Sequence, residues 1–391
     1  MGSVIVAGAR TPIGKFSGAL SSFSGMELGG FAVRAALERA GLTGAEIDYI
    51  VMGQVLQAGQ GQITARQAAV LGGVGMDVPA ITINKVCLSG LNAVHLADVL
   101  IRAGETEVVL AGGFESMSNA PYAMPSARNG ARMGDTKLVD LMIKDGLWCA
   151  FEKTHMGEGS DHVNVKMGIG RAEQDEWSAR SHERAAEATK AGRLADEITA
   201  VDVPQRKGDP ISVEEDEGIR PGTTAESLGK LKPAFVKDGT ITAGNASQIS
   251  DGGCALIVMS AENAKARGLT PLAEIVAHGQ VAGPDASLHL QPANAIRAAA
   301  AKAGLDPAGL DLYEMNEAFA SVALASGRDL GVSDDKVNVN GGAVALGHPI
   351  GMSGARLILT AAYELKRRGG GYAAAALCGG GGQGDALIIK V

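Results

Sequence analysis

The feature of this 391-residue chain that most constrains its fold is an internal repeat. Residues 32–52, AVRAALERAGLTGAEIDYIVM, match residues 295–315, AIRAAAAKAGLDPAGLDLYEM, at an offset of 263. Residues 89–104 match residues 353–369 at an offset of 264. Each copy predicts helices that alternate with buried strands, and the first helix ends at a glycine that can adopt a left-handed C-cap. We therefore expect two similar βαβαβ-type halves in a layered α/β arrangement.

A third match shows where the first copy is interrupted. Residues 255–259, ALIVM, match residues 386–390, ALIIK, at an offset of only 131, so the first copy holds about 133 residues that the second lacks. We expect the first half at 1–117 and 249–270, and the second half at 271–391. Residues 118–248 are predicted to form an inserted loop domain, which includes a polar-faced helix at 171–194.

Composition narrows the classes of function. The net charge of −8 argues against a nucleic-acid binder. No apolar run approaches the ~18 residues of a membrane span, and the start MGSVIVAGARTPIG has no basic region followed by an apolar stretch. The four cysteines, Cys87, Cys149, Cys254 and Cys378, follow neither a disulfide framework nor a metal-ligand pattern. We expect a cytoplasmic protein without a metal site.

Two of the cysteines occupy positions that favour chemistry. Cys87 lies in NKVCLSG, between a strand and a helix that begins at Ser89. A lone cysteine is equally often a small buried apolar residue, but a helix N-terminus and a nearby histidine are expected to lower the pKa of this thiol. Cys378 ends the apolar run AAAAL and precedes four glycines, where the alternative is an inert buried thiol. The backbone N–H groups of these glycines are free to face an oxyanion.

The loop GGAVALGHPIGMSGAR in the second copy corresponds to the Cys87 turn in the first. It holds His348 between Gly347 and Pro349 at a helix start, a position that favours catalysis over the surface or packing roles expected for most of the seven histidines. The repeat predicts that Cys87 and His348 lie close together. Asn316 follows an apolar strand, where polar residues are also often helix caps.

Four blocks together resemble one family. NKVCLSG, NEAF, GGAVALGHPIGMSGAR and CGGGGQG, in this order, resemble the signature blocks of thiolases, and the resemblance covers essentially the whole chain. It implies the thiolase fold, two βαβαβαββ halves with a loop domain inserted in the first. It also implies acetyl-CoA C-acetyltransferase activity, the reversible Claisen condensation of two acetyl-CoA to acetoacetyl-CoA and CoA. A degradative 3-ketoacyl-CoA thiolase of broader chain range is the alternative.

The resemblance also implies roles for individual residues. Cys87 would take the acyl group from acyl-CoA. His348 would activate Cys87 and, with a water held by Asn316, would stabilise a thioester enolate. Cys378 would remove a proton from the second acetyl-CoA, and the N–H groups of Cys87 and Gly380 would form the other oxyanion hole. No cofactor is expected, because the coenzyme A thioesters are substrates.

By the same resemblance, the inserted segment would bind coenzyme A. The implied substrate and coenzyme positions are Leu147, His155, Met156, Arg220, Ser227, Phe235, Ala243 and Ser247, with Ala318 and Phe319 in the NEAF block. Residues 220–237 carry four basic side chains against one acid, which suits a phosphorylated ligand, although a solvated surface strand would also explain the lysines. Residues 118–140 resemble the loop through which such dimers pair into tetramers, so a homotetramer is expected.

One stretch departs from the family pattern. Short-chain members usually carry Met-Gly-x-Gly-Pro where this chain has Leu288, His289, Leu290, Gln291 and Pro292. We expect His289 and Gln291 to narrow or reshape the acyl pocket, because they add bulk and remove backbone freedom. Three other classes remain open: a decarboxylating ketoacyl synthase, a thioesterase and a non-catalytic acyl-CoA carrier. None of these classes needs a thiol base at Cys378.

Overall fold

The strands of the computed structural model, which describes residues 2–391, follow the repeat. They run in the order β4-β3-β5-β12-β1 in the first half and β14-β15-β16-β13 in the second. The two sets meet where β1 pairs with β13 over two residues, and β2 pairs with β12. The bounds are β1 (Ser3–Arg10), β2 (Gly14–Lys15), β3 (Tyr49–Gly53), β4 (Ala80–Ile83), β5 (Val108–Ser116), β12 (Ser250–Ser260), β13 (Ala273–Ala282), β14 (Leu312–Met315), β15 (Tyr372–Gly379) and β16 (Gln383–Lys390).

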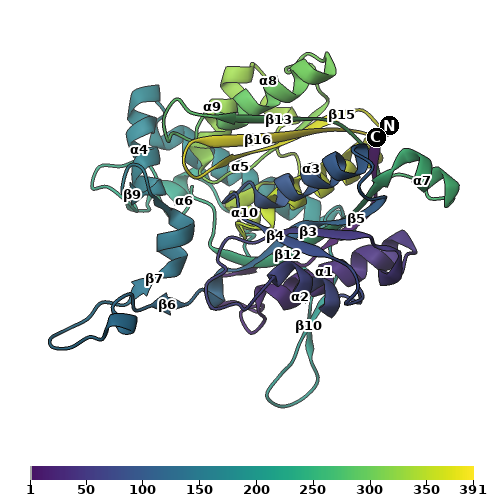
Figure 1. Ribbon diagram of the computed structural model, residues 1–391. Helices are drawn as coiled ribbons and strands as arrows, with labels where there is room; N and C mark the ends of the chain where they lie inside the picture. The colour runs from purple at the N-terminus through teal and green to yellow at the C-terminus, as the bar shows by residue number, and fades with distance from the viewer. Residues whose placement is uncertain (1) are drawn as a thin grey trace.

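The two sets of strands lie in separate layers, which are called the first and the second sheet below. Helices cover both sheets and also separate them, which gives five layers, α/β/α/β/α (Figure 1). One apolar core lies on the outer face of the first sheet, one on the outer face of the second, and the largest lies between the sheets. The layered α/β arrangement expected from the repeat is therefore confirmed. The helices are α1 (Gly25–Ala40), α2 (Thr64–Leu71) and α7 (Ala261–Ala266) on the first sheet, α8 (Gln291–Ala303) and α9 (Ala320–Leu330) on the second, and α3 (Ser89–Arg102) and α11 (Ser353–Arg368) in the middle, with the short α10 (Ala343–Leu346).

The two middle helices touch backbone to backbone at their N-termini. A Cβ atom on Gly90 of α3 would lie 2.8 Å from the Gly351 carbonyl oxygen and 2.9 Å from the Ala355 nitrogen. A Cβ atom on Gly354 of α11 would lie 2.3 Å from the Leu91 nitrogen. Such contacts admit only glycine. The turns that precede α3 and α11, at corresponding places in the repeat, are thereby held against each other.

The helix ends follow signals in the sequence. Gly41 after α1 and Gly304 after α8 both adopt the left-handed conformation, each with φ of 66°, as the repeat predicts. Ser24 caps α1 and forms a capping box with Glu27. No helix within residues 2–391 combines the length and apolar composition that crossing a membrane requires.

The segment that interrupts the first half leaves and re-enters the sheet at neighbouring points, because Ser116 of β5 pairs with Asp251 of β12. Its helix α5 packs on the second half, where Trp177 donates to Glu317 at 2.9 Å and Ser181 donates to the same carboxylate at 2.8 Å. A long arm that carries β6 and β7 projects from the body (Figure 1). The elements are β6 (Tyr122–Ala123), β7 (Val139–Asp140), β8 (Trp148–Cys149), β9 (Thr154–His155), α4 (Met156–Met167), α5 (Arg171–Lys190), β10 (Val201–Val203), β11 (Ile211–Val213) and α6 (Ala225–Gly229).

The contact between the middle helices makes a prediction about stability. Gly90→Ala should destabilise the protein by about 1–3 kcal/mol, because the new methyl group meets backbone atoms that cannot rotate away. Gly229→Ala is the matched control, since a Cβ atom there meets nothing within 4 Å. Thermal melts followed by circular dichroism should show a Tm lowered by several degrees for Gly90→Ala alone. Equal melting temperatures for the two variants would contradict this packing argument.

Candidate active site

A small cavity of about 50 Å³ lies where the two halves and the inserted segment meet. Cys87, His348 and Cys378 all line it, so the structure brings together three residues that are far apart in the sequence. The other walls are mostly apolar, and they consist of Gly146, Leu147, His155, Met156, Ser247, Leu288, Ala318, Phe319 and Ile350. Two thiols and an imidazole thus share one space with largely apolar walls.

Cys87 lies in a strained turn between β4 and α3. The residue before it, Val86, has a φ of 51°, in the left-handed region that β-branched residues rarely adopt. The Ser89 hydroxyl fixes this turn by accepting from the Lys85 N–H at 2.8 Å and donating to the Val86 carbonyl at 2.6 Å. No pattern in the sequence signals this strain.

His348 is oriented by its neighbours on both sides. Its Nδ1 lies 2.6 Å from the Ser353 hydroxyl, which donates its hydrogen to the Pro349 carbonyl at 3.0 Å. Because the hydroxyl has a single hydrogen, Nδ1 must donate, which leaves Nε2 as the basic nitrogen. The Asn316 amide nitrogen lies 3.3 Å from Nε2, and Asn316 Oδ1 is buried without a partner in the described chain. Ser353 was expected only as a helix start, so its role in orienting His348 was missed.

Cys378 is the last residue but one of β15, a strand of a tight hairpin. Cys378 pairs with Gly384 of β16, and Gly381 and Gly382 form the turn with φ values of 78° and 71°. These two positions need glycine for their backbone conformation. Two of the four glycines therefore serve the turn. Gly382 also approaches backbone closely, because a Cβ atom there would lie 1.9 Å from the Asp285 carbonyl oxygen.

The other two glycines of the hairpin face the Cys87 turn. Leu88 packs where a side chain on Gly379 would lie, since a Cβ atom there would be 2.6 Å from Leu88 Cγ. Gly380 has room beside Val86, and neither its N–H nor that of Cys87 donates to another residue within 2–391. Gly380 lines a second, larger cavity of about 740 Å³, which shares Met156 and Gly146 with the small one.

A groove of about 490 Å³ leads to the small cavity and shares five wall residues with it. It holds eight of the ten residues expected to bind substrate or coenzyme, namely Leu147, His155, Arg220, Phe235, Ala243, Ser247, Ala318 and Phe319. The His155 ring stacks on Phe235, with centroids 4.6 Å apart. Met156 lines the small cavity instead. Ser227 lines neither space; it is exposed, and its hydroxyl donates to the Thr224 carbonyl at 2.7 Å.

Family models match both halves of this arrangement. The model described as "Thiolase, N-terminal domain" matches residues 3–262, and "Thiolase, C-terminal domain" matches residues 269–391. The chain belongs to the thiolase family. This confirms the resemblance found in the four sequence blocks.

Full-length relatives of this thiolase carry consistent names. The "Probable acetyl-CoA acetyltransferase" of Mycolicibacterium smegmatis is 60% identical over 99% of this chain and 100% of its own length. The proteins named "Acetyl-CoA acetyltransferase" from Pseudomonas aeruginosa and Cupriavidus necator are 51% and 50% identical, over 99% of this chain and 98% of their own.

Burial dominates the electrostatics of the thiolase site and corrects one expectation. The pKa of Cys87 is raised to about 12, chiefly by burial, whereas its own backbone N–H lowers it less and the nearby Glu115 raises it further. The prediction that the helix start lowers this pKa was therefore wrong. Only 6% of Cys87 is exposed, and an anion in that apolar surrounding loses more hydration than the helix N-terminus returns.

The two other reacting groups are also held neutral. Burial raises the pKa of Cys378, and the adjacent Cys87 thiol raises it further. Burial lowers the pKa of His348 to about 3, and the Arg356 guanidinium adds to this effect. At neutral pH the site therefore contains two thiols and a neutral imidazole that can accept a proton.

The stretch that departs from the family pattern behaves differently from expectation. Leu288 lines the small cavity, but His289 is turned away and its Nε2 lies 2.7 Å from Asn164 Oδ1. The Gln291 amide donates to the Gly283 carbonyl at 2.9 Å. The expectation that His289 and Gln291 add bulk to the pocket was wrong, because both side chains make hydrogen bonds outside the cavity.

The raised pKa of Cys87 predicts how this thiol reacts with an alkylating agent. The rate of alkylation by iodoacetamide should rise about tenfold per pH unit from pH 7 to 10, since the reactive thiolate is a minor species below its pKa of about 12. Peptide-level mass spectrometry would separate Cys87 from the other cysteines. A free small-molecule thiol is the control and should level off above its pKa of about 8.5. A plateau for Cys87 near pH 8 would contradict the burial argument.

Proposed function

We propose that this thiolase is an acetyl-CoA C-acetyltransferase, which condenses two acetyl-CoA reversibly to acetoacetyl-CoA and CoA through an acetyl-Cys87 intermediate. The observation that carries the proposal is the pair of thiols, one from each half, beside a neutral histidine in one cavity at the end of the groove. The names of the full-length relatives support the same activity.

In the first half-reaction, His348 Nε2 accepts the proton of Cys87 as its sulfur attacks the thioester carbonyl of acetyl-CoA. The neutral state of His348 supports this role, because a protonated imidazole has no lone pair for the proton. CoA then leaves with that proton, and Cys87 carries the acetyl group. The N–H groups of Cys87 and Gly380, which donate to no other residue within 2–391, are suited to bind the tetrahedral oxyanion.

In the second half-reaction, His348 accepts the proton of the Cys378 thiol, and the resulting thiolate removes a proton from the methyl group of another acetyl-CoA. The raised pKa of Cys378 supports this role, because its thiolate is a stronger base than a solvated one. His348 and a water held by Asn316 stabilise the enolate oxygen, and the buried, unpartnered Asn316 Oδ1 is suited to accept from that water. The enolate attacks acetyl-Cys87 and acetoacetyl-CoA forms. The departing Cys87 thiolate takes the proton held by His348, which restores both thiols and the neutral imidazole.

The groove is the proposed coenzyme A site, and no cofactor is proposed beyond the substrates themselves. Its volume of about 490 Å³ lies in the range of sites for ligands of moderate size. Arg220 supplies a cation at its wall, and Phe235 and Phe319 supply aromatic surface. Ser227 is not part of this proposal, because it lies outside the groove.

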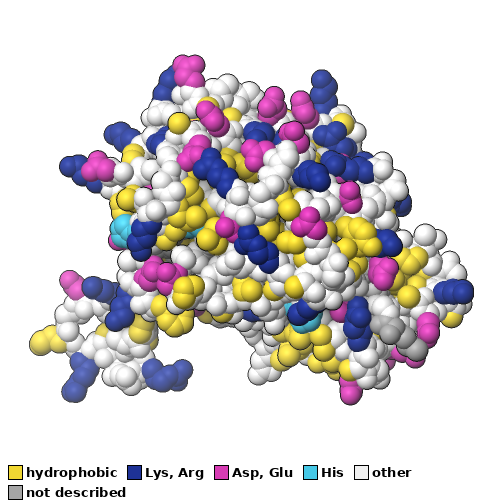
Figure 2. Space-filling model, turned by 90° about the horizontal axis from the view of Figure 1, so that it is seen from above, with side chains coloured by type: hydrophobic (Ala, Val, Ile, Leu, Met, Phe, Trp, Pro, Cys, Tyr) yellow, Lys and Arg dark blue, Asp and Glu magenta, His cyan; other side chains and the backbone are white. Residues whose placement is uncertain are grey.

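We also propose a homotetramer and a cytoplasmic location. The arm at 118–140 supports the assembly, since it projects from the body (Figure 1) and carries exposed apolar side chains. Figure 2 shows the arm at the lower left, with apolar groups beside basic ones. Met133 near its tip is 93% exposed, and Tyr122 and Leu138 are exposed by 63% and 66%. Apolar groups in such an arm are suited to be covered by another subunit.

The division of labour between the thiols is tested by two variants. Cys87→Ser should lose the acetyl mass increment that acetyl-CoA adds to the intact protein. Cys378→Ala should keep this increment yet form no acetoacetyl-CoA, because it lacks the base for the second half-reaction. Condensation by Cys378→Ala near the wild-type rate would overturn the assignment. The same variants would also distinguish a thioesterase, because a thioesterase would release free acetate even after Cys378 is removed.

The broader degradative thiolase is the second candidate, because the cavity of about 740 Å³ adjoins the small one at Met156 and Gly146. The small cavity itself, about 50 Å³, favours acetyl groups. We expect kcat/KM for thiolysis of acetoacetyl-CoA to exceed that for 3-ketohexanoyl-CoA by tens- to hundreds-fold, since each methylene discriminates by about 1–3 kcal/mol. Equal or rising values toward medium chains would favour the degradative enzyme.

A further inference from the structure

A partly buried ion pair links the two turns that carry the thiols. Lys85 lies two residues before Cys87, and its Nζ lies 2.8 and 3.0 Å from the two carboxylate oxygens of Asp385. Asp385 lies on β16 and pairs with Leu377, the residue before Cys378. The pair therefore joins positions 300 residues apart, one in each half of the repeat.

Asp385 is the centre of this link. It is fully buried, whereas the Lys85 side chain is 22% exposed. Asn92 of α3 donates to the same carboxylate at 3.1 Å, and His278 Nε2 of β13 lies 3.8 Å from it. A carboxylate so placed needs a cation and donors in fixed positions, since water cannot replace them.

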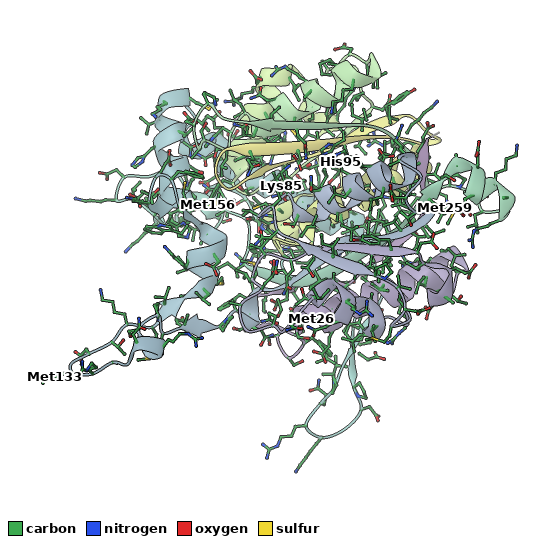
Figure 3. The ribbon with its side chains drawn as sticks, viewed as in Figure 1. Met26, Lys85, His95, Met133, Met156 and Met259 are labelled. Atoms are coloured by element: carbon green, nitrogen blue, oxygen red, sulfur yellow. The ribbon has the colours of Figure 1, made fainter. Side chains whose placement is uncertain are left out.

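Lys85 is the cation that serves Asp385. Figure 3 places Lys85 and His95 near each other, between α3 and the strands of the second half. The His95 ring stacks on His278 with centroids 3.5 Å apart, and burial, with His278 next, lowers the pKa of His95 to about 3. The nearby Lys302 ammonium donates to the His278 carbonyl at 2.6 Å instead.

Apart from the Asn92 hydrogen bond to the same Asp385, the contacts described between the Cys87 turn and the hairpin are apolar and have no fixed direction. Leu88 packs on Gly379 through apolar atoms, which can slide along each other. The Ser89 hydroxyl sets the inner shape of the Cys87 turn but makes no bond to the hairpin. A bidentate ion pair has the direction that apolar packing lacks.

We propose that Lys85 and Asp385 form a positioning pair that holds the Cys87 turn in register with the hairpin of Cys378 and Gly380. The inference rests on the proposed function.

Acetyl transfer between CoA molecules uses Cys87 and His348, with Gly380 as one oxyanion donor. Condensation also needs Cys378 beside the acetylated Cys87. Loss of the pair should therefore impair condensation more than transfer, because a displacement near 1 Å costs about 10²-fold where a second reacting group must be aligned.

The test compares two rates in one set of variants. Exchange of labelled CoA into acetyl-CoA reports the first half-reaction, and formation of acetoacetyl-CoA reports both. For Lys85→Met we expect exchange lowered about threefold and condensation about 30-fold or more. Lys85→Arg, which keeps the cation, should recover most of the condensation rate. Lys302→Met is the matched control, since it removes a neighbouring lysine that does not contact Asp385.

The two rates and their recovery either support or overturn the positioning role of Lys85 and Asp385. Equal losses in exchange and condensation, or no loss in either, would overturn the positioning role. Failure of Lys85→Arg to recover condensation would do the same.

Lys85→Met combined with Asp385→Leu should lower the condensation rate less than the product of the two single changes. Thermal melts would identify any variant that fails to fold. In that case, Asp385→Asn, which keeps the shape, provides the same comparison. Wild-type protein without exchange or condensation would instead overturn the proposed function.

Discussion

The close approach of α3 and α11 is the constraint on which the site depends. Two glycine-mediated backbone contacts hold the helix starts together, and the loops that precede those helices carry Cys87 and His348. An internally repeated chain brings equivalent loops from its two halves to one place when equivalent helices pack in this way. The second thiol, Cys378, lies on a different element, the β15–β16 hairpin.

Burial determines the charge states in this site. The small cavity is lined mainly by apolar groups, and it raises the pKa of both thiols while it lowers that of the imidazole. No reacting group enters the cycle already charged. Each thiol must therefore lose its proton in the course of the reaction. Catalysis then depends on the relative positions of the reacting groups rather than on a thiolate that is present beforehand. The bonds that orient His348 through Ser353, and the link between Lys85 and Asp385, meet that demand.

Much of this could be predicted from the sequence because repetition and motif order are local patterns. The repeat predicted the layers, the C-capping glycines and the meeting of Cys87 with His348. The predictions that failed concern properties set by residues distant in the sequence, which no local pattern reveals. The pKa of Cys87 follows from burial by distant segments, and His289 turned out to face Asn164, 125 residues away. The strain at Val86 and the partner of Lys85 were likewise set by tertiary contacts.

The inserted segment begins and ends on adjacent strands, where Ser116 pairs with Asp251. The sheet fixes the distance between those ends whatever lies between them. Changes of length in the surface loops of the insert therefore need not disturb the strands beneath it. Glu197 and Asp216 are exceptions, because they pair with the buried Arg10 of β1. Cys87 and Cys378 lie outside the insert, whereas Arg220 and Phe235 lie within it. The reacting thiols thus come from the repeated halves, whereas the insert supplies much of the wall around them. Changes to those wall residues are therefore a route to new acyl donors with the same pair of thiols.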